Sequence, residues 1–233
     1  MTKRSKRYRK NIEGLNLEKA YTLDEAIGVL KDTTTAKYDE SIELNLKTGV
    51  DPKKADQQVR GTVALPHGTG KTIRLVVLTK GDKVKEALDA GADEAGADEL
   101  VDKIKGGWMD FDALVVTPDM MREVGKLGKL LGPRGLMPSP KAGTVTTDVA
   151  KAVKEIKAGK VEYKVDKSAN INIAIAKISF TKEQIAENAK ALLGAIYRAK
   201  PASVKGAYWQ SLHMTSTLGP GLKLDENNIA TVI

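Results

Sequence analysis

The sequence predicts two parts of different fold class: an α+β outer domain with an antiparallel sheet and helices, and an α/β domain with a parallel sheet inserted into it. Strands that alternate apolar and polar residues lie on both sides of the middle, at 41–47 and 171–178, which is typical of a sheet with one wet face. Between them, residues 73–78 form a nearly continuous apolar run, as expected for a strand covered on both faces. Glycine-rich segments at 66–70 and 158–160 separate the two patterns.

The first stretch of the outer part begins with a helix signal. Thr22 and Glu25 have the spacing of a capping box, and apolar residues then recur at helical intervals. The alternating strand at 41–47 follows, ended by Gly49 and Pro52. A less regular strand is predicted at 59–65.

The middle of the chain alternates apolar strands with short helices, the pattern of a small parallel α/β unit. Thr117 and Pro118 read as an N-cap followed by proline at the first helical position. The other expected elements are strands at 73–78 and 114–116 and helices at 83–90, at 98–105 and from Thr147 or Asp148 onward.

After Gly159 the half-wet strand pattern returns. Strands are expected at 161–165 and 171–178. A second capping box, Thr181 with Gln184, starts a long amphipathic helix, and 204–217 is read as the last strand.

The excess positive charge lies outside the middle of the chain. The 233 residues hold 38 Lys plus Arg and 30 Asp plus Glu, a net charge of +8. Residues 67–158 hold 15 basic and 14 acidic residues, a net of +1, which leaves 23 and 16, a net of +7, in the rest. The first ten residues alone contribute +6, an arm expected to be mobile. Such an arm favours binding to an anionic surface. The alternative is a tail that only keeps the protein soluble.

Several classes of protein are excluded by composition. The chain has no cysteine and only two histidines, so it has no disulfide framework, thiolate metal site, cysteine nucleophile or histidine-rich metal centre. No apolar stretch approaches the roughly 18 residues that span a bilayer, and no apolar segment follows the basic N-terminus as in a secretory signal. We therefore expect a cytoplasmic protein without membrane contact, metal, cofactor or catalytic residues.

One glycine-rich segment resembles a phosphate-binding loop only in part. The full phosphate-loop pattern requires a glycine five positions before Gly70, but Leu65 occupies that position. The segment Gly68-Thr69-Gly70-Lys71-Thr72 also precedes an apolar strand, whereas a true phosphate loop follows one. The alternative it leaves is a nucleotide-binding enzyme that uses the inserted α/β domain. The segment fits a hinge between the two domains better. The expected hinge residues are Pro66, His67, Gly68 and Gly159.

Residues 125–143 combine many glycines and prolines with cations and no acid. Glycine lets a backbone approach phosphates closely, and exposed amides add to the charge. The alternative is a long connection shaped by its turns. The candidate secondary contact with phosphates here consists of Lys126, Lys129, Arg134 and Lys141.

Longer segments identify the chain by resemblance. Residues 56–68, 107–112 (Gly-Trp-Met-Asp-Phe-Asp), 117–121 and 129–138 (Lys-Leu-Leu-Gly-Pro-Arg-Gly-Leu-Met-Pro) closely resemble the bacterial ribosomal protein L-one family. The resemblance covers essentially the whole chain. It implies an RNA-binding α+β domain made of residues 1–67 and 160–233, and an inserted Rossmann-like, three-layer domain at 68–159 that binds no dinucleotide.

The resemblance also implies partners. Such proteins belong to the large ribosomal subunit and bind the mobile stalk of its ribosomal RNA, beside the exit site for transfer RNA. They are thought to assist release of deacylated tRNA, and many repress translation of their own operon mRNA. A monomer is expected when free. A polyanion-binding adaptor without RNA specificity stays open as a further alternative.

The RNA-contacting positions of the family map onto two places in this sequence, the start of the first alternating strand and the end of the last one. Tyr38 stands where the family often has phenylalanine, and Leu218 where it usually has methionine. Asn172 stands where it often has histidine, so Asn172 is given no role. The expected RNA-binding residues are Lys37, Tyr38, Ser41, Lys167, Ser211, Thr217, Leu218 and Gly219.

Overall fold

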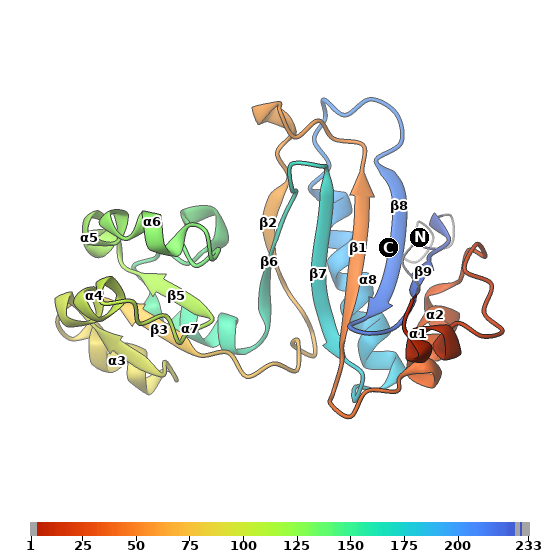
Figure 1. Ribbon diagram of the computed structural model, residues 1–233. Coiled ribbons are helices and arrows are strands. Elements are labelled where there is room, and N and C mark those ends of the chain that lie inside the picture. The colour runs from red at the N-terminus through yellow and green to blue at the C-terminus, as the bar shows by residue number, and fades with distance from the viewer. Residues whose placement is uncertain (1–3, 227–228, 230–233) are drawn as a thin grey trace. The chain divides into compact units, whose positions relative to one another are not determined.

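The computed structural model describes residues 4–226 and 229, and it divides into two compact units (Figure 1). We call Met1–Gly70 together with Glu162–Ile233 the outer unit, and Lys71–Val161 the inserted unit. Their borders fall at Gly70/Lys71 and Val161/Glu162, close to the domain borders expected at 67/68 and 159/160.

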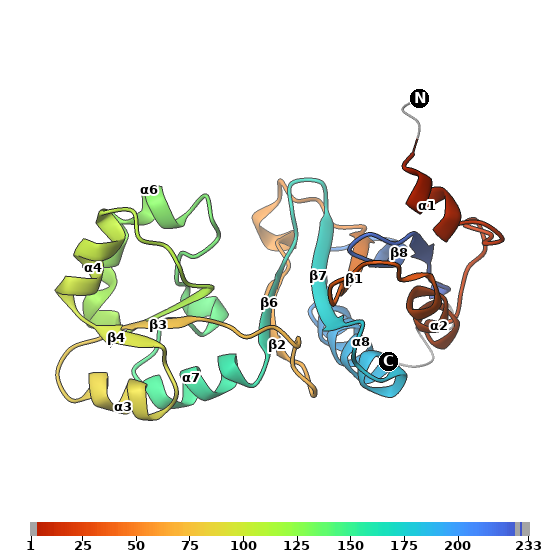
Figure 2. The ribbon, with the colours of Figure 1, turned by 60° about the horizontal axis from the view of Figure 1, so that its bottom comes forward.

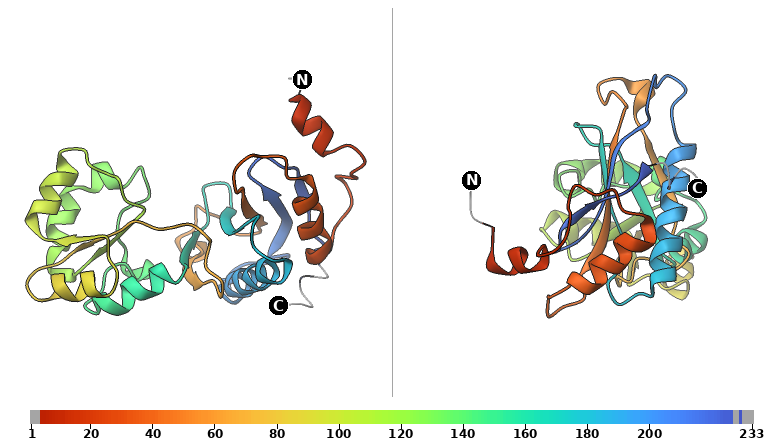
Figure 3. Two further views of the ribbon diagram at one scale, coloured as in Figure 1. Left: turned by 90° about the horizontal axis from the view of Figure 1, so that it is seen from below. Right: turned by 90° about the vertical axis from the view of Figure 1, so that its right-hand side faces the viewer.

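The outer unit is built on a four-stranded antiparallel sheet in the order β7-β1-β8-β9. Along β1, half-buried and buried residues alternate strictly. Two helices, α2 and α8, pack on each other and on one face of the sheet (Figure 3). The alternation along β1 shows that one sheet face is buried and the other is half open to water. The elements are β1 (Ser41–Thr48), β7 (Asn170–Lys177), β8 (Trp209–Ser216), β9 (Gly221–Lys223), α2 (Leu23–Thr33) and α8 (Lys182–Arg198). The predicted antiparallel α+β class is confirmed.

Both predicted capping boxes form. The Thr22 hydroxyl accepts the Glu25 amide at 3.3 Å, and the Glu25 carboxylate accepts the Thr22 amide at 3.0 Å. Thr181 and Gln184 make the same reciprocal pair at 3.3 and 3.0 Å. These bonds satisfy amides that a helix start leaves without an intrahelical acceptor, so α2 and α8 begin where the sequence predicts.

The basic arm is not a featureless tail in the part described. Helix α1 (Lys6–Asn11) begins at Ser5, whose hydroxyl accepts the Tyr8 amide at 3.2 Å. Its last residue, Asn11, is buried and donates to the Thr35 hydroxyl at 3.3 Å. The run of positive charge predicted a mobile arm, because it gives no sign of the Ser5 cap or of the Asn11 contact with Thr35. Lys3, one of its six cations, lies outside the described residues.

A second, two-stranded sheet belongs to the outer unit except for the first two residues of one strand, Lys160 and Val161. It joins β2 (Arg60–Ala64) to β6 (Lys160–Lys164), and a short 3₁₀ turn, η1 (Ala55–Gln57), precedes β2. Both strands were predicted within two residues of these bounds.

The inserted unit is a three-stranded parallel sheet in the order β4-β3-β5 with helices on both faces (Figure 2). Leu75, Val77 and Val115 face a core shared with α3 and α7, while Val76 and Leu78 face a core shared with α4, α5 and α6. The elements are β3 (Leu75–Leu78), α3 (Lys83–Asp89), β4 (Glu94–Gly96), α4 (Asp98–Lys105), β5 (Ala113–Val116), η2 (Pro118–Met120), α5 (Met121–Lys126), α6 (Gly128–Leu131), η3 (Pro140–Ala142) and α7 (Val149–Lys157). The predicted three-layer α/β class is confirmed.

Three details differ from the sequence expectations. Strand β8 begins at Trp209 instead of residue 204, and the short strands β4 and β9 were not predicted. The Thr117 hydroxyl makes no capping bond, because it donates to the Leu78 carbonyl at 3.4 Å. None of the helices in the part of the chain that the structure describes is long and apolar enough to cross a membrane.

Candidate RNA interface

Two predicted RNA-binding residues from opposite ends of the chain meet at one end of the outer sheet. The Thr217 hydroxyl accepts the Ser41 amide at 3.1 Å, and the Thr217 amide donates to the Ser41 carbonyl at 3.1 Å. The antiparallel register of β1 and β8 pairs Ile42 with Ser216. Ser41, which precedes Ile42, therefore lies opposite Thr217, which follows Ser216. The Thr217 side chain is thereby held by the backbone of β1.

The residues around this contact leave an aromatic ring and a tight turn open to solvent. Tyr38 is 54% exposed, so its ring is open to solvent. Leu218 and Gly219 are half-buried in the turn that follows β8, where the Gly219 amide donates to the Ser216 carbonyl at 3.2 Å. Lys37 is exposed beside Tyr38 in sequence. Aromatic faces, hydroxyls and nearby cations are the groups that RNA-binding surfaces use.

Charges near Ser41 are mixed and largely tied to the protein. The Lys177 ammonium donates to the Ser41 hydroxyl at 2.9 Å, so this cation orients a predicted contact residue. Asp39 accepts the Ser179 amide at 3.1 Å and its hydroxyl at 2.7 Å. This end of the sheet is therefore an ordered polar surface more than a simple cationic patch.

Ser211 and Lys167 lie near the other end of the sheet. Ser211 pairs with Lys47 across β1 and β8, and the Lys47 ammonium donates to the Ser168 carbonyl in the turn that holds Lys167. Six residues of strand separate this end from Ser41, roughly 20 Å at the usual rise. The predicted residues therefore form two groups and do not share one contact point.

The wet sheet face runs between the two groups and carries residues that the sequence reasoning missed. Asn172, Asn45 and His213 form a cross-strand row on β7, β1 and β8, and Lys223 of β9 extends it. Burial, followed by the nearby Lys223 charge, lowers the pKa of His213, which favours a neutral imidazole at neutral pH. The signal for this row was the polar half of each alternating strand, read together across the sheet.

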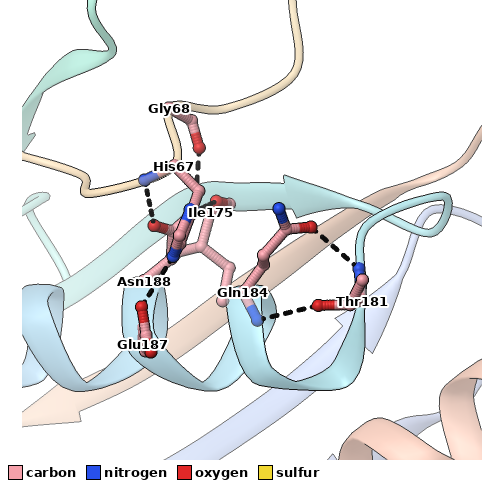
Figure 4. Close-up of polar contacts among 7 residues, drawn as sticks. All are labelled: His67, Gly68, Ile175, Thr181, Gln184, Glu187 and Asn188. Atoms are coloured by element: carbon pink, nitrogen blue, oxygen red, sulfur yellow. Dashed lines mark hydrogen bonds and ion pairs between the residues drawn. The ribbon is translucent and has the colours of Figure 1, made fainter.

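The expected hinge residues His67 and Gly68 are bound to helix α8 (Figure 4). The buried Asn188 side chain accepts the His67 amide at 3.1 Å and donates to the Gly68 carbonyl and to the Ile175 carbonyl, each at 2.8 Å. The His67 imidazole also contacts the Glu187 carboxylate at 2.6 Å.

The unit borders lie beyond these anchored residues. The chain leaves the outer unit at Gly70, which has a φ of +72°. The returning crossing follows Gly159, whose φ is +100°. Pro66 is exposed ahead of the anchored residues. A hinge role for Pro66, His67, Gly68 and Gly159 stays a prediction.

The glycine-rich segment of the inserted unit is more helical than its composition suggests. Leu127 and Leu131 are buried, and they anchor α5 and α6 to the core. The four cations proposed as a secondary contact are exposed, and one of them, Lys126, pairs with Glu123 at 2.7 Å. Within the described residues no acid lies at ion-pair distance from the others, Lys129, Arg134 and Lys141.

In the part of the chain that the structure describes, neither unit shows an arrangement suited to a metal. Across residues 4–226 and 229, no three histidine, aspartate or glutamate side chains gather closely enough to hold a metal ion. What the geometry does offer is a surface of hydroxyls, amides, one exposed ring and scattered cations.

Comparison with known proteins assigns the family. Residues 30–220 match the model of the ribosomal protein L1p/L10e family. The chain is 61% identical over 225 residues to the large ribosomal subunit protein uL1 of Protochlamydia amoebophila, covering 97% of this chain and 95% of that one. It is 56% identical over 229 residues to the protein of the same name from Kosmotoga olearia and 54% to that from Chlamydia trachomatis, covering 98% of this chain and 99% of each relative. The chain therefore belongs to the ribosomal protein L1p/L10e family.

Proposed function

We propose that this protein is a constituent of the large ribosomal subunit that binds the mobile stalk of the ribosomal RNA with its outer unit. The observation that carries the proposal is the junction of Ser41 and Thr217, in which two chain ends form one ordered, hydroxyl-bearing surface. Membership of a family whose relatives are named large ribosomal subunit protein uL1 supports the same assignment. A ribosomal protein of this family is not an enzyme.

Further roles follow from the stalk assignment. We propose that the protein assists release of deacylated tRNA from the exit site and represses translation of its own operon mRNA by binding a stalk-like structure there. It acts on the ribosome in the cytoplasm and is monomeric when free. The charge distribution supports RNA partners: the outer parts carry a net of +7, of which the first ten residues supply +6.

The division of labour between the units is also a proposal. Residues 1–67 and 160–233 form the RNA-binding domain, and residues 68–159 form an inserted Rossmann-like domain. The secondary RNA contact of the inserted domain consists of the exposed cations Lys126, Lys129, Arg134 and Lys141. Phosphate contacts carry no sequence information directly, so these cations would add affinity with little sequence preference.

Competition binding tests the proposal directly. The protein is titrated with stalk RNA and with a scrambled RNA of equal length at physiological salt, and stalk RNA is expected to bind at least tenfold more tightly, since specific contacts add to phosphate neutralisation. Equal binding of both RNAs would leave only a polyanion-binding adaptor. Crosslinking in cells with sequencing of the bound RNA then tests the ribosomal and messenger targets together.

Salt dependence provides an independent check on the contact type. If about four to six phosphates are neutralised, log K falls with log salt at a slope of roughly −3 to −5. A salt-independent affinity for stalk RNA contradicts the proposed mode of binding.

A further inference from the structure

A carboxylate lies buried directly beneath the candidate interface. Glu40 is 1% exposed, and the other buried polar residues of the described chain are uncharged Asn, Gln, Thr and Ser. Burial of a carboxylate destabilises a fold unless hydrogen bonds replace its lost water. Its position immediately before β1, next to Ser41, suggests that its contacts serve the surface above it.

Glu40 holds the turn that follows β8. One of its carboxylate oxygens accepts the Leu218 amide at 2.9 Å, and its backbone carbonyl accepts the Ile178 amide at 2.9 Å. The side chain therefore joins the Leu218 turn to a residue whose own backbone is fixed by the end of β7. A buried amide that loses its acceptor costs the full desolvation penalty of that group, which makes this a firm attachment.

The turn itself is tight and has little room to rearrange. A Cβ added at Gly219 would lie 2.4 Å from the Ser216 hydroxyl oxygen. Ser216 is 2% exposed, and its hydroxyl has no hydrogen-bond partner within the described residues. Beyond the strand pairing, the turn is thus fixed by the Thr217 bonds to Ser41 on one side and by Glu40 beneath Leu218 on the other.

An ordered turn matters for binding because a surface that is already in its bound conformation loses less entropy when the partner arrives. Without an acceptor at position 40, the Leu218 amide would lack its partner, and the turn would sample other conformations. RNA binding would then have to order it again.

We infer that Glu40 is a positioning residue of the RNA interface, whose carboxylate fixes the turn so that Thr217 and Leu218 are presented to RNA while Glu40 itself makes no RNA contact. The inference rests on the proposed RNA-binding function of the outer unit. It differs from that function in assigning affinity to a side chain buried below the surface.

The test compares two near-isosteric variants. Glu40→Met keeps the length of the side chain and removes both oxygens, whereas Glu40→Gln keeps an oxygen that can accept the Leu218 amide. Thr48→Val is the matched control, because Thr48 is also 1% exposed and lies at the other end of β1, where its hydroxyl donates to the Ala169 carbonyl at 2.8 Å. Affinity for stalk RNA, its salt dependence and Leu218 amide exchange in the free protein are measured.

Glu40→Met is expected to weaken stalk-RNA binding about tenfold or more, while Glu40→Gln and Thr48→Val stay within about threefold of the wild type. The slope of log K against log salt is expected to stay unchanged in Glu40→Met, because no phosphate contact is lost. The Leu218 amide is expected to exchange slowly in the wild type and in Glu40→Gln, and quickly in Glu40→Met.

Several results would overturn the inference. These are wild-type affinity in folded Glu40→Met, an equal loss in Thr48→Val, or a Leu218 amide that exchanges in the wild type as fast as in an unfolded peptide. If Glu40→Met does not fold, this wild-type exchange rate decides alone. Failure of the proposed function is distinguishable, because the wild type would then show no preference for stalk RNA over scrambled RNA while the exchange data still report on Glu40.

Discussion

Replacement of Asn188 by alanine should destabilise the outer unit by removing one buried amide that joins three segments of chain. Its side chain makes three hydrogen bonds, to His67, Gly68 and Ile175, at 3.1, 2.8 and 2.8 Å. At about 1 kcal/mol each, these bonds sum to about 3 kcal/mol. Alanine returns about 0.6 kcal/mol through its higher helix propensity in α8. We expect a loss of about 2–3 kcal/mol in the free energy of unfolding.

The neighbouring position supplies a matched control. Glu187 lies in the same helix and contacts the same His67, but its side chain is 59% exposed. Exposed ion pairs contribute little, because water and salt screen them. Glu187→Ala should therefore change stability by less than about 0.5 kcal/mol, although it also gains helix propensity.

The two tryptophans allow each unit to be followed separately. Trp209 is buried in the outer unit and Trp108 belongs to the inserted unit. In a Trp108→Phe background, urea unfolding followed by fluorescence reports the outer unit alone. A loss of 2–3 kcal/mol corresponds to a midpoint shift of about 1 M urea. A shift for Asn188→Ala no larger than that for Glu187→Ala would refute the reasoning.

Three further predictions address the interface and the inserted unit. Thr217→Ala should weaken stalk-RNA binding about tenfold, whereas Lys83→Ala in the inserted unit should leave it unchanged, and equal effects in folded proteins would count against the assigned surface. Gly219→Ala should also weaken stalk-RNA binding, because the added Cβ would lie 2.4 Å from the Ser216 hydroxyl oxygen. Adding Ser216→Ala removes this clash and should restore much of the lost affinity. A double variant that binds no better than Gly219→Ala would contradict the packing argument. Hydrogen bonds from the Lys157 ammonium and then from the Leu75 amide lower the pKa of Asp93 in the folded protein. Ionised Asp93 therefore stabilises the folded inserted unit above its unfolded pKa, and this contribution is lost as the pH falls below about 4. Asp93→Asn should reduce the fall of the urea midpoint of the inserted unit on the acid side.

Helix starts were predictable because their signals are local. The capping boxes at Thr22 and Thr181 each need only residues three positions apart, and both formed as expected. The apolar run before residue 78 likewise predicted a strand covered on both faces, since burial on two sides leaves no polar alternation.

Short strands were missed for the opposite reason. Strand β4 is Glu94-Ala95-Gly96, which has neither an apolar run nor β-branched residues, and it exists because it pairs with β3. Strand β9 is equally short and depends on β8. Pairing between distant segments is a tertiary property that no local pattern carries.

The RNA-contact residues came from family resemblance, because their arrangement spans the whole chain. Ser41 and Thr217 are 176 positions apart, and nothing in the periodicity of either strand brings them together. The sequence did contain a signal for Asn188, because this polar residue lies on the buried stripe of α8, between Ile185 and Leu192. A polar side chain on an apolar stripe implies partners, and here these are the segment leading out of the outer unit and the β7 carbonyl of Ile175.

Buried polar groups and surface charge have separate tasks in the outer unit. The net charge of +7 outside residues 67–158 falls to +1 once the first ten residues are set aside, so we expect the rest of this part to attract RNA only weakly through bulk charge. Selectivity must then come from the shape of a small surface, and shape requires that its turns be fixed. Glu40 beneath Leu218 does this for the candidate interface, while Asn188 fixes the departing segment at Gly68. We expect cations in the arm to raise the encounter rate with any RNA, and the fixed turn to help the protein distinguish one RNA from another.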